Sequence, residues 1–379
     1  MQYQGSPIGE ADIRTALAGH GLPAAAYRSA AVYDWEQEHL LGGTWICVGR
    51  SIELGPEERR GVSAAGEGIL LTRDRAGIAR AFHNSCRHRG HELIEPGGRE
   101  RGAVVRCPYH SWVYGLDGRL VSAPQFGEMP GFDPAGLSLH AVRLAEWEGW
   151  SFVNLSGHAP ELATHVGDLA GELAAYGIAD LVAAATREYV LAANWKLVVE
   201  NYHECYHCPS VHPELCRVSP PLSGTNFQPT GGWIGGTMEL RAGADTMSLD
   251  GRSGGAPLPG VVGSRRRQVL YAGLFPNLLV SAHPDYVLTH LLHPIDAGHT
   301  RVTCEWLFPP EGAAASGFDA AYAVDFWDLT NRQDWRACES VQRGIASRRY
   351  VPGPLGPGEG AVHQFVSLVA RTYATGRLP

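Results

Sequence analysis

The chain carries Cys86-Arg87-His88 and Cys107-Pro108-Tyr109-His110 in its first third, and these two short stretches decide how the residues around them fold. Each stretch supplies one cysteine and one histidine, so together they offer two thiolates and two imidazoles. Such a set of four side chains binds either a structural zinc ion or an iron–sulfur cluster. The sequence therefore predicts two loops that lie close together around a metal cofactor.

The order of the ligands favours the cluster over zinc. Zinc fingers commonly take two cysteines from one arm and two histidines from the other, whereas each arm here mixes the two types. In a Rieske [2Fe–2S] cluster, two cysteines bind one iron and two histidines bind the other. Cys86, His88, Cys107 and His110 are therefore predicted to bind a [2Fe–2S] cluster, with structural zinc as the alternative.

The residues that follow each arm carry a family resemblance. Arg89-Gly90-His91 follows the first arm, and Ser111-Trp112-Val113-Tyr114-Gly115 follows the second. The two segments closely resemble the Rieske domain of the alpha subunits of ring-hydroxylating oxygenases. The resemblance implies an α+β fold, in which an all-β Rieske domain is joined to a catalytic domain with a helix-grip antiparallel sheet.

A second group of metal-ligand residues lies in the stretch from Asn194 to His212. Read as a helix, this stretch places Glu200, Glu204 and His207 on one face. Pro209 disfavours further helix, so a turn there can bring His212 back toward His207. Two histidines and one carboxylate on the same side of an Fe(II) ion leave positions open for oxygen and substrate.

The segment also resembles the mononuclear iron motif of the Rieske oxygenases, and this resemblance supplies the remaining site residues. The third iron ligand is implied near the run Cys338-Glu339-Ser340-Val341-Gln342, where Asp334 is the matching position and Asp325 and Asp328 are competitors. Glu204 matches the acid that links the iron site to the cluster of a neighbouring subunit. Asn201 belongs to the same motif and is a further candidate catalytic residue.

The resemblance implies an oxygenase that uses O₂ and electrons from NAD(P)H. The chain shows no G-x-G-x-x-G after a strand, so a separate flavin/iron–sulfur reductase is expected to deliver the electrons. Transfer between subunits implies a homotrimer or a larger ring of trimers. The alternative of a Rieske electron carrier without oxygenase activity conflicts with the second metal motif.

The glutamate in Glu204-Cys205-Tyr206-His207 resembles the branch that acts on quaternary ammonium compounds such as glycine betaine, carnitine and stachydrine. Hydroxylation of an N-methyl carbon there amounts to N-demethylation. Aromatic rings attract such cations, and the predicted pocket residues are Trp233, Tyr271, Phe275 and Trp306. Aromatic-ring dioxygenation and aryl-ether O-demethylation are the alternatives.

Composition narrows the class of protein. The net charge of −8 gives no basic surface for nucleic acid, and no apolar run or leader predicts a membrane span or secretion, so a cytoplasmic enzyme is expected. Of the eight cysteines, the six outside the cluster are expected to be reduced, and a C-x-x-C redox pair is the alternative for Cys205 and Cys208.

Turn signals and periodicity divide the chain into three segments. Residues 1–40 are expected to form helices that pack on the catalytic domain, residues 41–155 to form the Rieske domain, and residues 156–379 to form the catalytic iron domain. The Rieske segment contains an expected hairpin, with strands at Ile69–Thr72 and Ile78–Phe82. Two long helices, roughly Asp319–Ser347 and Gly358–Thr375, are expected to end the chain.

Overall fold

The computed structural model describes residues 5–127 and 129–378 of the 379-residue chain. The chain divides into two compact units. One contains Met1–Leu40 together with Pro160–Pro379, and the other contains Leu41–Ala159. Both cysteine/histidine arms therefore lie in the second unit, and the residues of the predicted mononuclear site lie in the first.

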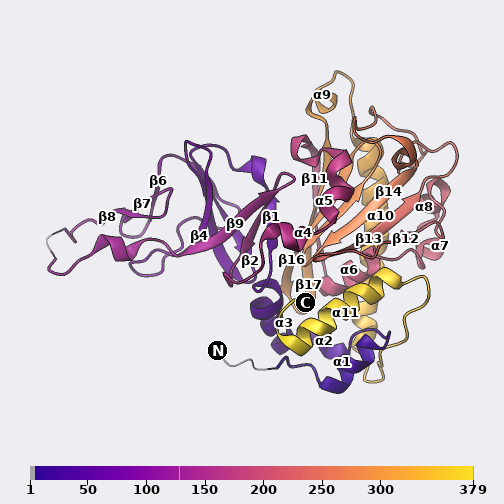
Figure 1. Cartoon of the computed structure of the whole chain (residues 1–379), viewed down its shortest axis with the longest axis horizontal. Coiled ribbons are helices and arrows are strands. Elements are labelled where there is room, and N and C mark those ends of the chain that lie inside the picture. The colour runs from indigo at the N-terminus through magenta and orange to yellow at the C-terminus, as the bar shows by residue number, and fades with distance from the viewer. Residues whose placement is uncertain (1–4, 128, 379) are drawn as a thin grey trace. The chain divides into compact units, whose positions relative to one another are not determined.

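The Leu41–Ala159 unit consists of two antiparallel sheets (Figure 1). The larger sheet has the strand order β1-β10-β9-β4-β3-β2-β5, and the smaller has the order β6-β7-β8. The strands of the larger sheet are β1 (Ile46–Arg50), β2 (Glu58–Ala64), β3 (Glu67–Arg73), β4 (Ala79–His83), β5 (Arg99–Arg101), β9 (Ala141–Trp147) and β10 (Trp150–Asn154). Those of the smaller sheet are β6 (Val104–Arg106), β7 (Val113–Gly115) and β8 (Leu120–Ser122), and two short helical turns are η2 (Ser51–Glu53) and η3 (Pro134–Leu137).

The predicted hairpin is confirmed as the pair β3 and β4. Leu71 lies opposite Ala81, and Gly77 closes the turn at φ +84°, a backbone conformation that glycine adopts without strain. The apolar core of the unit includes both arm cysteines, Cys86 and Cys107, together with Trp112 and Tyr114. The loops that carry the two arms are thus fixed by buried aromatic side chains.

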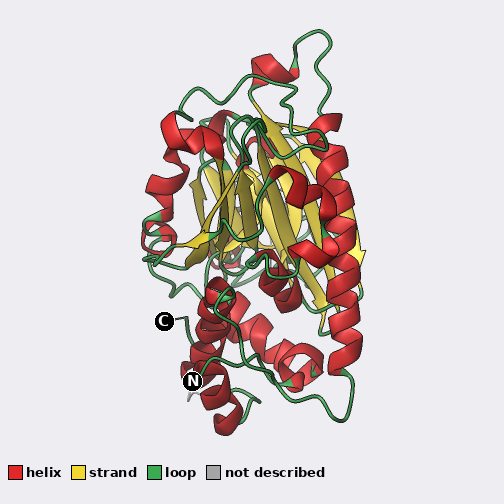
Figure 2. Cartoon of the chain, turned by 90° about the vertical axis from the view of Figure 1, so that its right-hand side faces the viewer, coloured by secondary structure: helices red, strands yellow, loops and turns green. Residues whose placement is uncertain are grey.

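The other unit is organised around one antiparallel sheet with the strand order β11-β17-β16-β15-β14-β13-β12. Its strands are β11 (Val182–Leu191), β12 (Thr225–Asn226), β13 (Trp233–Glu239), β14 (Gln268–Leu274), β15 (Leu278–Ala282), β16 (Val287–Asp296) and β17 (His299–Phe308). The central strand β15 is buried at every residue, and β16 is buried over its first four residues. Figure 2 shows the strands of the sheet in yellow with helices in red around them, the usual way in which an apolar sheet face is covered.

The helices of this unit lie before, between and after the strands of the sheet in sequence. Before it come α1 (Glu10–Leu17), α2 (Ala24–Arg28), α3 (Ala30–Trp35), the π-helical η1 (Glu36–Leu41), α4 (Leu162–Val166), α5 (Leu169–Leu173), η4 (Ala174–Tyr176) and η5 (Ile178–Asp180). Between or after the strands come α6 (Trp195–Tyr202), α7 (Cys208–Val211), α8 (Pro213–Val218), η6 (Gly263–Arg267), α9 (Pro310–Ala313), α10 (Ala321–Ile345) and α11 (Gly360–Thr375). The two long C-terminal helices are confirmed. One unit has an antiparallel sheet with helices and the other is all-β, which confirms the predicted α+β class.

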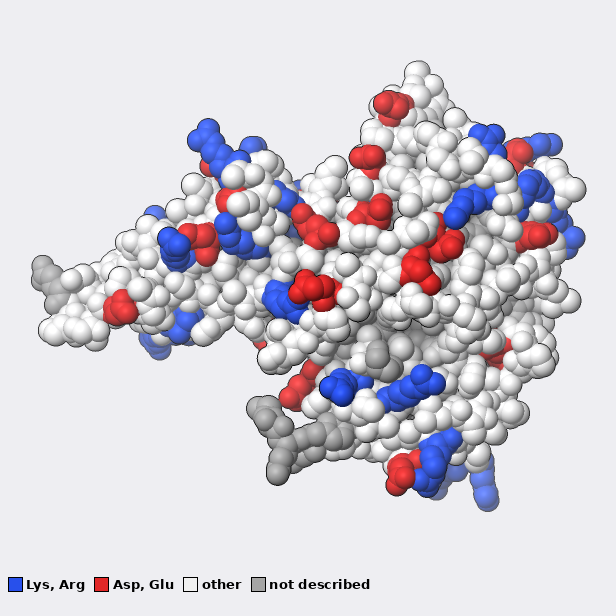
Figure 3. Space-filling model, in the orientation of Figure 1, with Lys and Arg blue, Asp and Glu red and all other residues white. Residues whose placement is uncertain are grey.

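The helices α1, α2 and α3 belong to the same compact unit as the α6 segment. Tyr27 of α2 donates a hydrogen bond to the Glu200 carboxylate at 2.8 Å, and α1 lies against α11. On the face drawn in Figure 3, acidic and basic side chains are interspersed on each unit. Among the described helices, none is both long and apolar enough to cross a membrane.

The helix predicted through Glu200, Glu204 and His207 is wrong in its extent. The helix α6 ends at Tyr202, and α7 begins only at Cys208. The Glu204 carboxylate accepts hydrogen bonds from the backbone N–H groups of Tyr206 and His207. Because a side chain that binds nearby N–H groups competes with the helical pattern, the segment from residue 203 to 207 forms a turn.

Candidate metal centres

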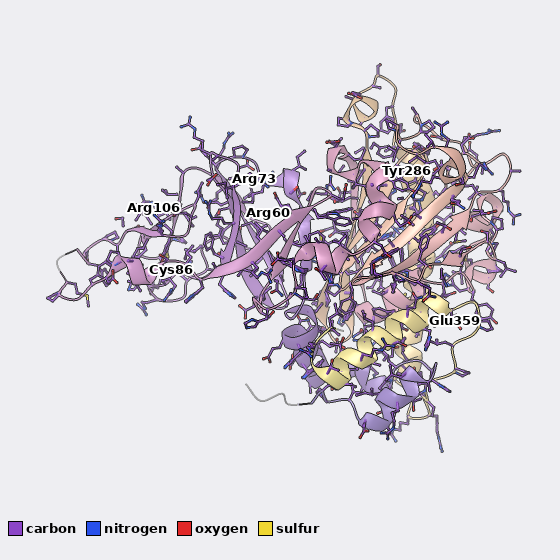
Figure 4. All side chains as sticks on the ribbon, viewed as in Figure 1. Arg60, Arg73, Cys86, Arg106, Tyr286 and Glu359 are labelled. Atoms are coloured by element: carbon purple, nitrogen blue, oxygen red, sulfur yellow. A yellow bond between two sulfur atoms is a disulfide. The ribbon has the colours of Figure 1, made fainter. Side chains whose placement is uncertain are left out.

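The first candidate centre lies where two loops of the Leu41–Ala159 unit meet. Cys86, labelled in Figure 4, lies in the loop after β4, and Cys107 lies directly after β6. Cys86 and Cys107 are 3% and 1% exposed. The imidazole rings of His88 and His110 have centroids 4.6 Å apart. The structure thus brings the two histidines of the predicted set into contact, and both cysteines lie in one core cluster.

The surroundings of these side chains fit an iron–sulfur cluster. Burial raises the pKa of the Cys107 thiol, the backbone N–H groups of Tyr109 and His110 lower it, and the nearby Cys86 thiol raises it again. Amide donors aimed at a cysteine sulfur stabilise its thiolate form, which is the form that binds iron. The Nδ1 atom of His88 is buried and has no hydrogen-bond partner among the described residues, so it is free to bind a metal.

The second candidate centre is formed by His207, His212 and Asp334, each of which has one ligand atom within 4.8 Å of the others. The Nε2 atoms of the two histidines are 3.1 Å apart. One Asp334 oxygen lies 3.2 Å from Nε2 of His207 and 2.8 Å from Nε2 of His212. Two imidazole nitrogens and a carboxylate that face one point form the facial triad typical of non-haem iron.

The opposite ring nitrogens of both histidines are held by further side chains. The Nδ1 atom of His207 contacts the Glu204 carboxylate, and Nδ1 of His212 lies 2.7 Å from the Gln333 amide oxygen. Such partners fix the ring orientation of a metal ligand and make it more basic. Burial lowers the pKa of His207, but its hydrogen bonds to Asp334 and Glu204 outweigh burial and raise that pKa to about 9.

The structure separates Asp334 from the two competing acids. Asp328 accepts a hydrogen bond from the Tyr189 hydroxyl at 2.6 Å and forms an ion pair with Arg332. Asp325 is exposed and lines a surface groove with Ala183 and Phe318. Asp334 alone of the three lies beside His207 and His212, since it is roughly two helical turns further along α10 than the other two acids.

A cavity of about 220 Å³ opens beside the triad. Its walls include Asn201, Tyr202, His203, Tyr271, Trp327 and Thr330, and the triad and Glu204 line it as well. Tyr202 and Tyr271 meet edge to face, with centroids 5.9 Å apart, and the Trp327 ring lies 6.5 Å from that of Tyr271. The cavity is thus walled partly by aromatic rings and reaches the candidate metal ligands.

Three of the four aromatic residues predicted for this pocket lie elsewhere. Trp233 and Phe275 line a separate cavity of about 10 Å³ together with Phe365 of α11. Trp306 of β17 is fully buried and does not line the cavity beside the triad. Of the four, Tyr271 lines the cavity beside the triad. The sequence pattern identifies strand residues but not which part of a strand lies beside the candidate metal ligands. Tyr202 and Trp327 were missed, although Tyr202 stands inside the iron motif.

The cysteines of this segment also differ from the prediction. Cys205 and Cys208 form a disulfide, whereas reduced thiols were expected. The turn between α6 and α7 brings their Cα atoms to 4.9 Å, which is within the range of natural disulfides. Of the other cysteines outside the predicted cluster, Cys47, Cys216, Cys304 and Cys338 are free, as expected.

Two metal centres of this kind, one in an all-β unit and one beside an antiparallel sheet, define a Rieske non-haem iron oxygenase. Residues 44–133 match the family described as Rieske [2Fe-2S] domain, and residues 178–375 match the family described as ring hydroxylating alpha subunit (catalytic domain). The chain belongs to the ring-hydroxylating oxygenase alpha subunits. The prediction of an oxygenase with a [2Fe–2S] cluster and a mononuclear iron is confirmed. The Rieske match argues against the structural-zinc alternative, and the catalytic-domain match argues against a simple Rieske electron carrier.

Curated relatives extend over most of the chain. The glycine betaine monooxygenase oxygenase subunit of Pseudomonas aeruginosa (strain UCBPP-PA14) is 30% identical over 365 residues, which cover 88% of this chain and 84% of the relative. The carnitine monooxygenase oxygenase subunit of Escherichia coli (strain K12) is 36% identical over 341 residues, which cover 87% and 85%.

Solved structures show the same similarity. The quaternary ammonium Rieske monooxygenase CntA, in complex with L-carnitine, matches with a TM-score of 0.79 and 26% identity over 97% of this chain and 99% of that one. A naphthalene 1,2-dioxygenase from Rhodococcus sp. bound to indole matches with a TM-score of 0.76 and 18% identity, over 96% of this chain and 98% of that one. The second match shows a shared fold alone.

Proposed function

We propose that this enzyme removes an N-methyl group from a small quaternary ammonium compound. The observation that carries the proposal is the cavity in which the rings of Tyr202, Tyr271 and Trp327 lie beside the His207–His212–Asp334 triad. Aromatic faces attract a quaternary ammonium ion through their ring quadrupoles. The relatives named for glycine betaine and carnitine support the same class of substrate.

The proposed reaction balances with one O₂, two electrons and two protons. One oxygen atom becomes the hydroxyl of an N-hydroxymethyl group and the other becomes water. The carbon–nitrogen bond of the hydroxymethyl group then breaks, which releases formaldehyde, a proton and the tertiary amine. When bound, the iron supplies the activation of O₂ that this oxidation requires.

The protein residues have separate proposed roles. His207, His212 and Asp334 hold the mononuclear iron, and Cys86, His88, Cys107 and His110 hold the cluster. Glu204 orients His207 and connects the two kinds of centre, and Asn201 belongs to the wall of the cavity beside it. We further propose that residues 41–155 form the cluster domain, that residues 156–379 form the catalytic domain, and that residues 1–40 pack on the latter.

Electrons are proposed to come from NAD(P)H through a separate flavin/iron–sulfur reductase. The proposal also includes a cytoplasmic location, where NAD(P)H is supplied, and assembly as a homotrimer or a ring of trimers. Inter-subunit electron transfer is described for one solved relative, a quaternary ammonium Rieske monooxygenase. This supports a closed assembly.

The test combines metal analysis with product detection. The purified enzyme, with a surrogate reductase and NAD(P)H, is expected to release formaldehyde from at least one of glycine betaine, carnitine and stachydrine. Asp334→Ala is expected to lose one of three irons per chain and all product formation while the Rieske absorption persists. Asp325→Ala is the matched control, since its carboxylate is exposed on the same helix, and it should retain both. Full iron content and activity in Asp334→Ala would contradict the assignment.

A further inference from the structure

The Cys205–Cys208 disulfide encloses one of the candidate iron ligands. The bond joins two cysteines that are three positions apart, so Tyr206 and His207 lie inside the ring that it closes. A hydrogen bond also crosses this ring, since the backbone N–H of Cys208 donates to the Cys205 carbonyl at 3.2 Å. The backbone on both sides of His207 is therefore tied to a covalent link.

The same ring contacts two further residues of the site. Glu204 stands directly before it, and its carboxylate accepts the backbone N–H groups of Tyr206 and His207 and contacts Nδ1 of His207. On the other side of the ring, the Cys208 carbonyl accepts the N–H of His212, the second histidine of the triad, at 2.8 Å. Both histidines and the carboxylate between the centres are thus bonded to the segment that the disulfide closes.

The position of the ring between two helices makes its closure matter. The helix α6 ends at Tyr202 and α7 begins at Cys208, so His207 is carried by a turn and not by a continuous helix. Opening a disulfide returns conformational freedom to the residues that it encloses. A ligand held in its binding geometry binds more tightly than a mobile one, because the cost of ordering it has already been met. Reduction of the bond should therefore weaken iron binding by His207.

The surroundings of the pair allow the bond to open and close. The spacing Cys-x-x-Cys is that of sites that exchange thiols and disulfides. Both cysteines line the cavity beside the triad; Cys208 is 3% exposed and Cys205 is more exposed, so a reductant approaches from the Cys205 side. In a compartment that keeps thiols reduced, such as the proposed cytoplasmic location, disulfides are usually transient and catalytic or redox-sensing.

We propose that Cys205 and Cys208 are positioning residues whose redox state controls iron binding at the triad. The disulfide holds His207 ready for the iron, and reduction to two thiols releases it. This inference rests on the proposed function, because it takes His207 as an iron ligand. In the reduction, a dithiol gives two electrons and two protons to the pair. The S–S bond breaks, two S–H groups form, and the dithiol becomes a disulfide; the reverse exchange closes the ring again.

The first test measures Fe(II) binding by the full-length enzyme, with its cluster in place and its mononuclear iron removed by mild chelation. The dissociation constant is compared anaerobically before and after treatment with the phosphine TCEP, which breaks the disulfide and becomes a phosphine oxide. Thiol alkylation with mass spectrometry reports the state of Cys205 and Cys208, and the Rieske absorption reports the cluster. The dissociation constant for Fe(II) is expected to rise roughly tenfold on reduction, as when a partner behind a metal ligand is lost, and to fall again on reoxidation.

The outcomes separate this inference from the proposed function. An unchanged dissociation constant, once alkylation shows the bond to be open, would overturn the redox control and leave the proposed function intact. A pair that stays reduced in air would do the same. If the oxidised enzyme binds no iron beyond the two of its cluster, the proposed function fails, and the redox control with it.

The second test uses a variant that cannot form the bond. The double substitution Cys205→Ser/Cys208→Ser is expected to bind Fe(II) as weakly as the reduced wild type and to show no response to TCEP. Formaldehyde release by this variant should recover as Fe(II) is added, because the defect lies in iron loading. Cys216→Ser is the matched control, since Cys216 is a free thiol in the nearby helix α8, and it should keep the affinity and the response of the wild type. Wild-type affinity in the double variant, or an equal loss in Cys216→Ser, would overturn the redox control.

Discussion

The Glu204 carboxylate holds the turn that carries His207 and, at the same time, the imidazole itself. One oxygen accepts the backbone N–H of His207 at 3.1 Å, and the other contacts Nδ1 of the same residue. A carboxylate in this position keeps Nε2 of His207 directed toward Asp334, 3.2 Å away. Glu204 therefore contributes to both the position and the basicity of this candidate ligand.

Glu204→Gln should leave both metal centres loaded but lower product formation by about 10- to 100-fold, the usual range for loss of a partner behind a metal ligand. The amide keeps the size of the side chain but is a weaker acceptor for the imidazole N–H. Single-turnover oxidation of the reduced cluster, with substrate and O₂ present, measures the effect directly. Glu188→Gln, on an exposed strand position, is the control. A wild-type rate in Glu204→Gln would mean that electrons reach the iron without this carboxylate.

At the scale of elements, α6 is fixed by a buried ion pair. Nζ of Lys196 lies 2.8 Å and 2.9 Å from the two oxygens of Glu36, and both side chains are completely buried. The Trp195 indole and the Tyr373 hydroxyl also donate to the Glu36 carboxylate. The N-terminal segment, α6 and α11 are thus joined through one carboxylate.

Lys196→Ala should destabilise the protein by about 3–5 kcal/mol, because it leaves the Glu36 charge buried without its cation. Arg332→Ala is the matched control. The Arg332 side chain is 60% exposed in its ion pair with Asp328, so loss of this ion pair should cost about 0–1 kcal/mol. Chemical denaturation followed by tryptophan fluorescence measures both free energies of unfolding. Similar values for the two variants would contradict the anchoring role of Lys196.

The C-terminal end of α6 predicts a dependence of stability on pH. Burial raises the pKa of Glu200 to about 7, although the Tyr27 hydroxyl bonded to it lowers that pKa. Folded Glu200 therefore binds its proton more tightly than the unfolded chain does. The free energy of unfolding contributed by this residue should fall as pH rises from about 4.5 to about 7, and then level off.

Glu200→Gln mimics the protonated acid and should remove this dependence. The variant is expected to match the wild type near pH 5 and to melt several degrees higher near pH 8, which thermal unfolding at both pH values can measure. A difference in melting temperature that stays constant with pH would show that Glu200 does not titrate in this range. Asp250→Asn, at an exposed position outside α6, controls for general charge effects.

The elements also show which parts of the site a sequence can predict. Local spacing is enough to predict Cys86, His88, Cys107 and His110 as ligands, because each arm keeps its cysteine and histidine within four residues. Asp334 required a resemblance, since more than a hundred residues separate it from His212. The end of α6 was missed because Glu204 binds backbone N–H groups, and propensity alone does not describe that competition. Trp327 was missed because its place on the cavity wall depends on how α10 packs on the sheet.

At the scale of the whole molecule, each chain carries one complete set of candidate ligands for each centre, in two separate compact units. We expect the cluster of one chain to deliver electrons to the iron of a neighbouring chain. A closed ring of subunits makes this possible for every chain at once, since each has one neighbour on each side.

Mixed assemblies test this arrangement. Cys86→Ser removes a cluster ligand, and Asp334→Ala removes an iron ligand, so each variant alone should be inactive while it retains its other centre. Co-expressed with two different affinity tags, the variants should form mixed rings in which an intact cluster lies next to an intact iron site of another chain. If the two variants mix at random, half of the chains keep an intact iron site, and half of those lie next to a chain with an intact cluster. Activity should therefore recover to roughly a quarter of the wild-type rate per chain. Mixed rings that contain both centres but show no activity would mean that electrons stay within one chain, and that Glu204 serves only to orient His207.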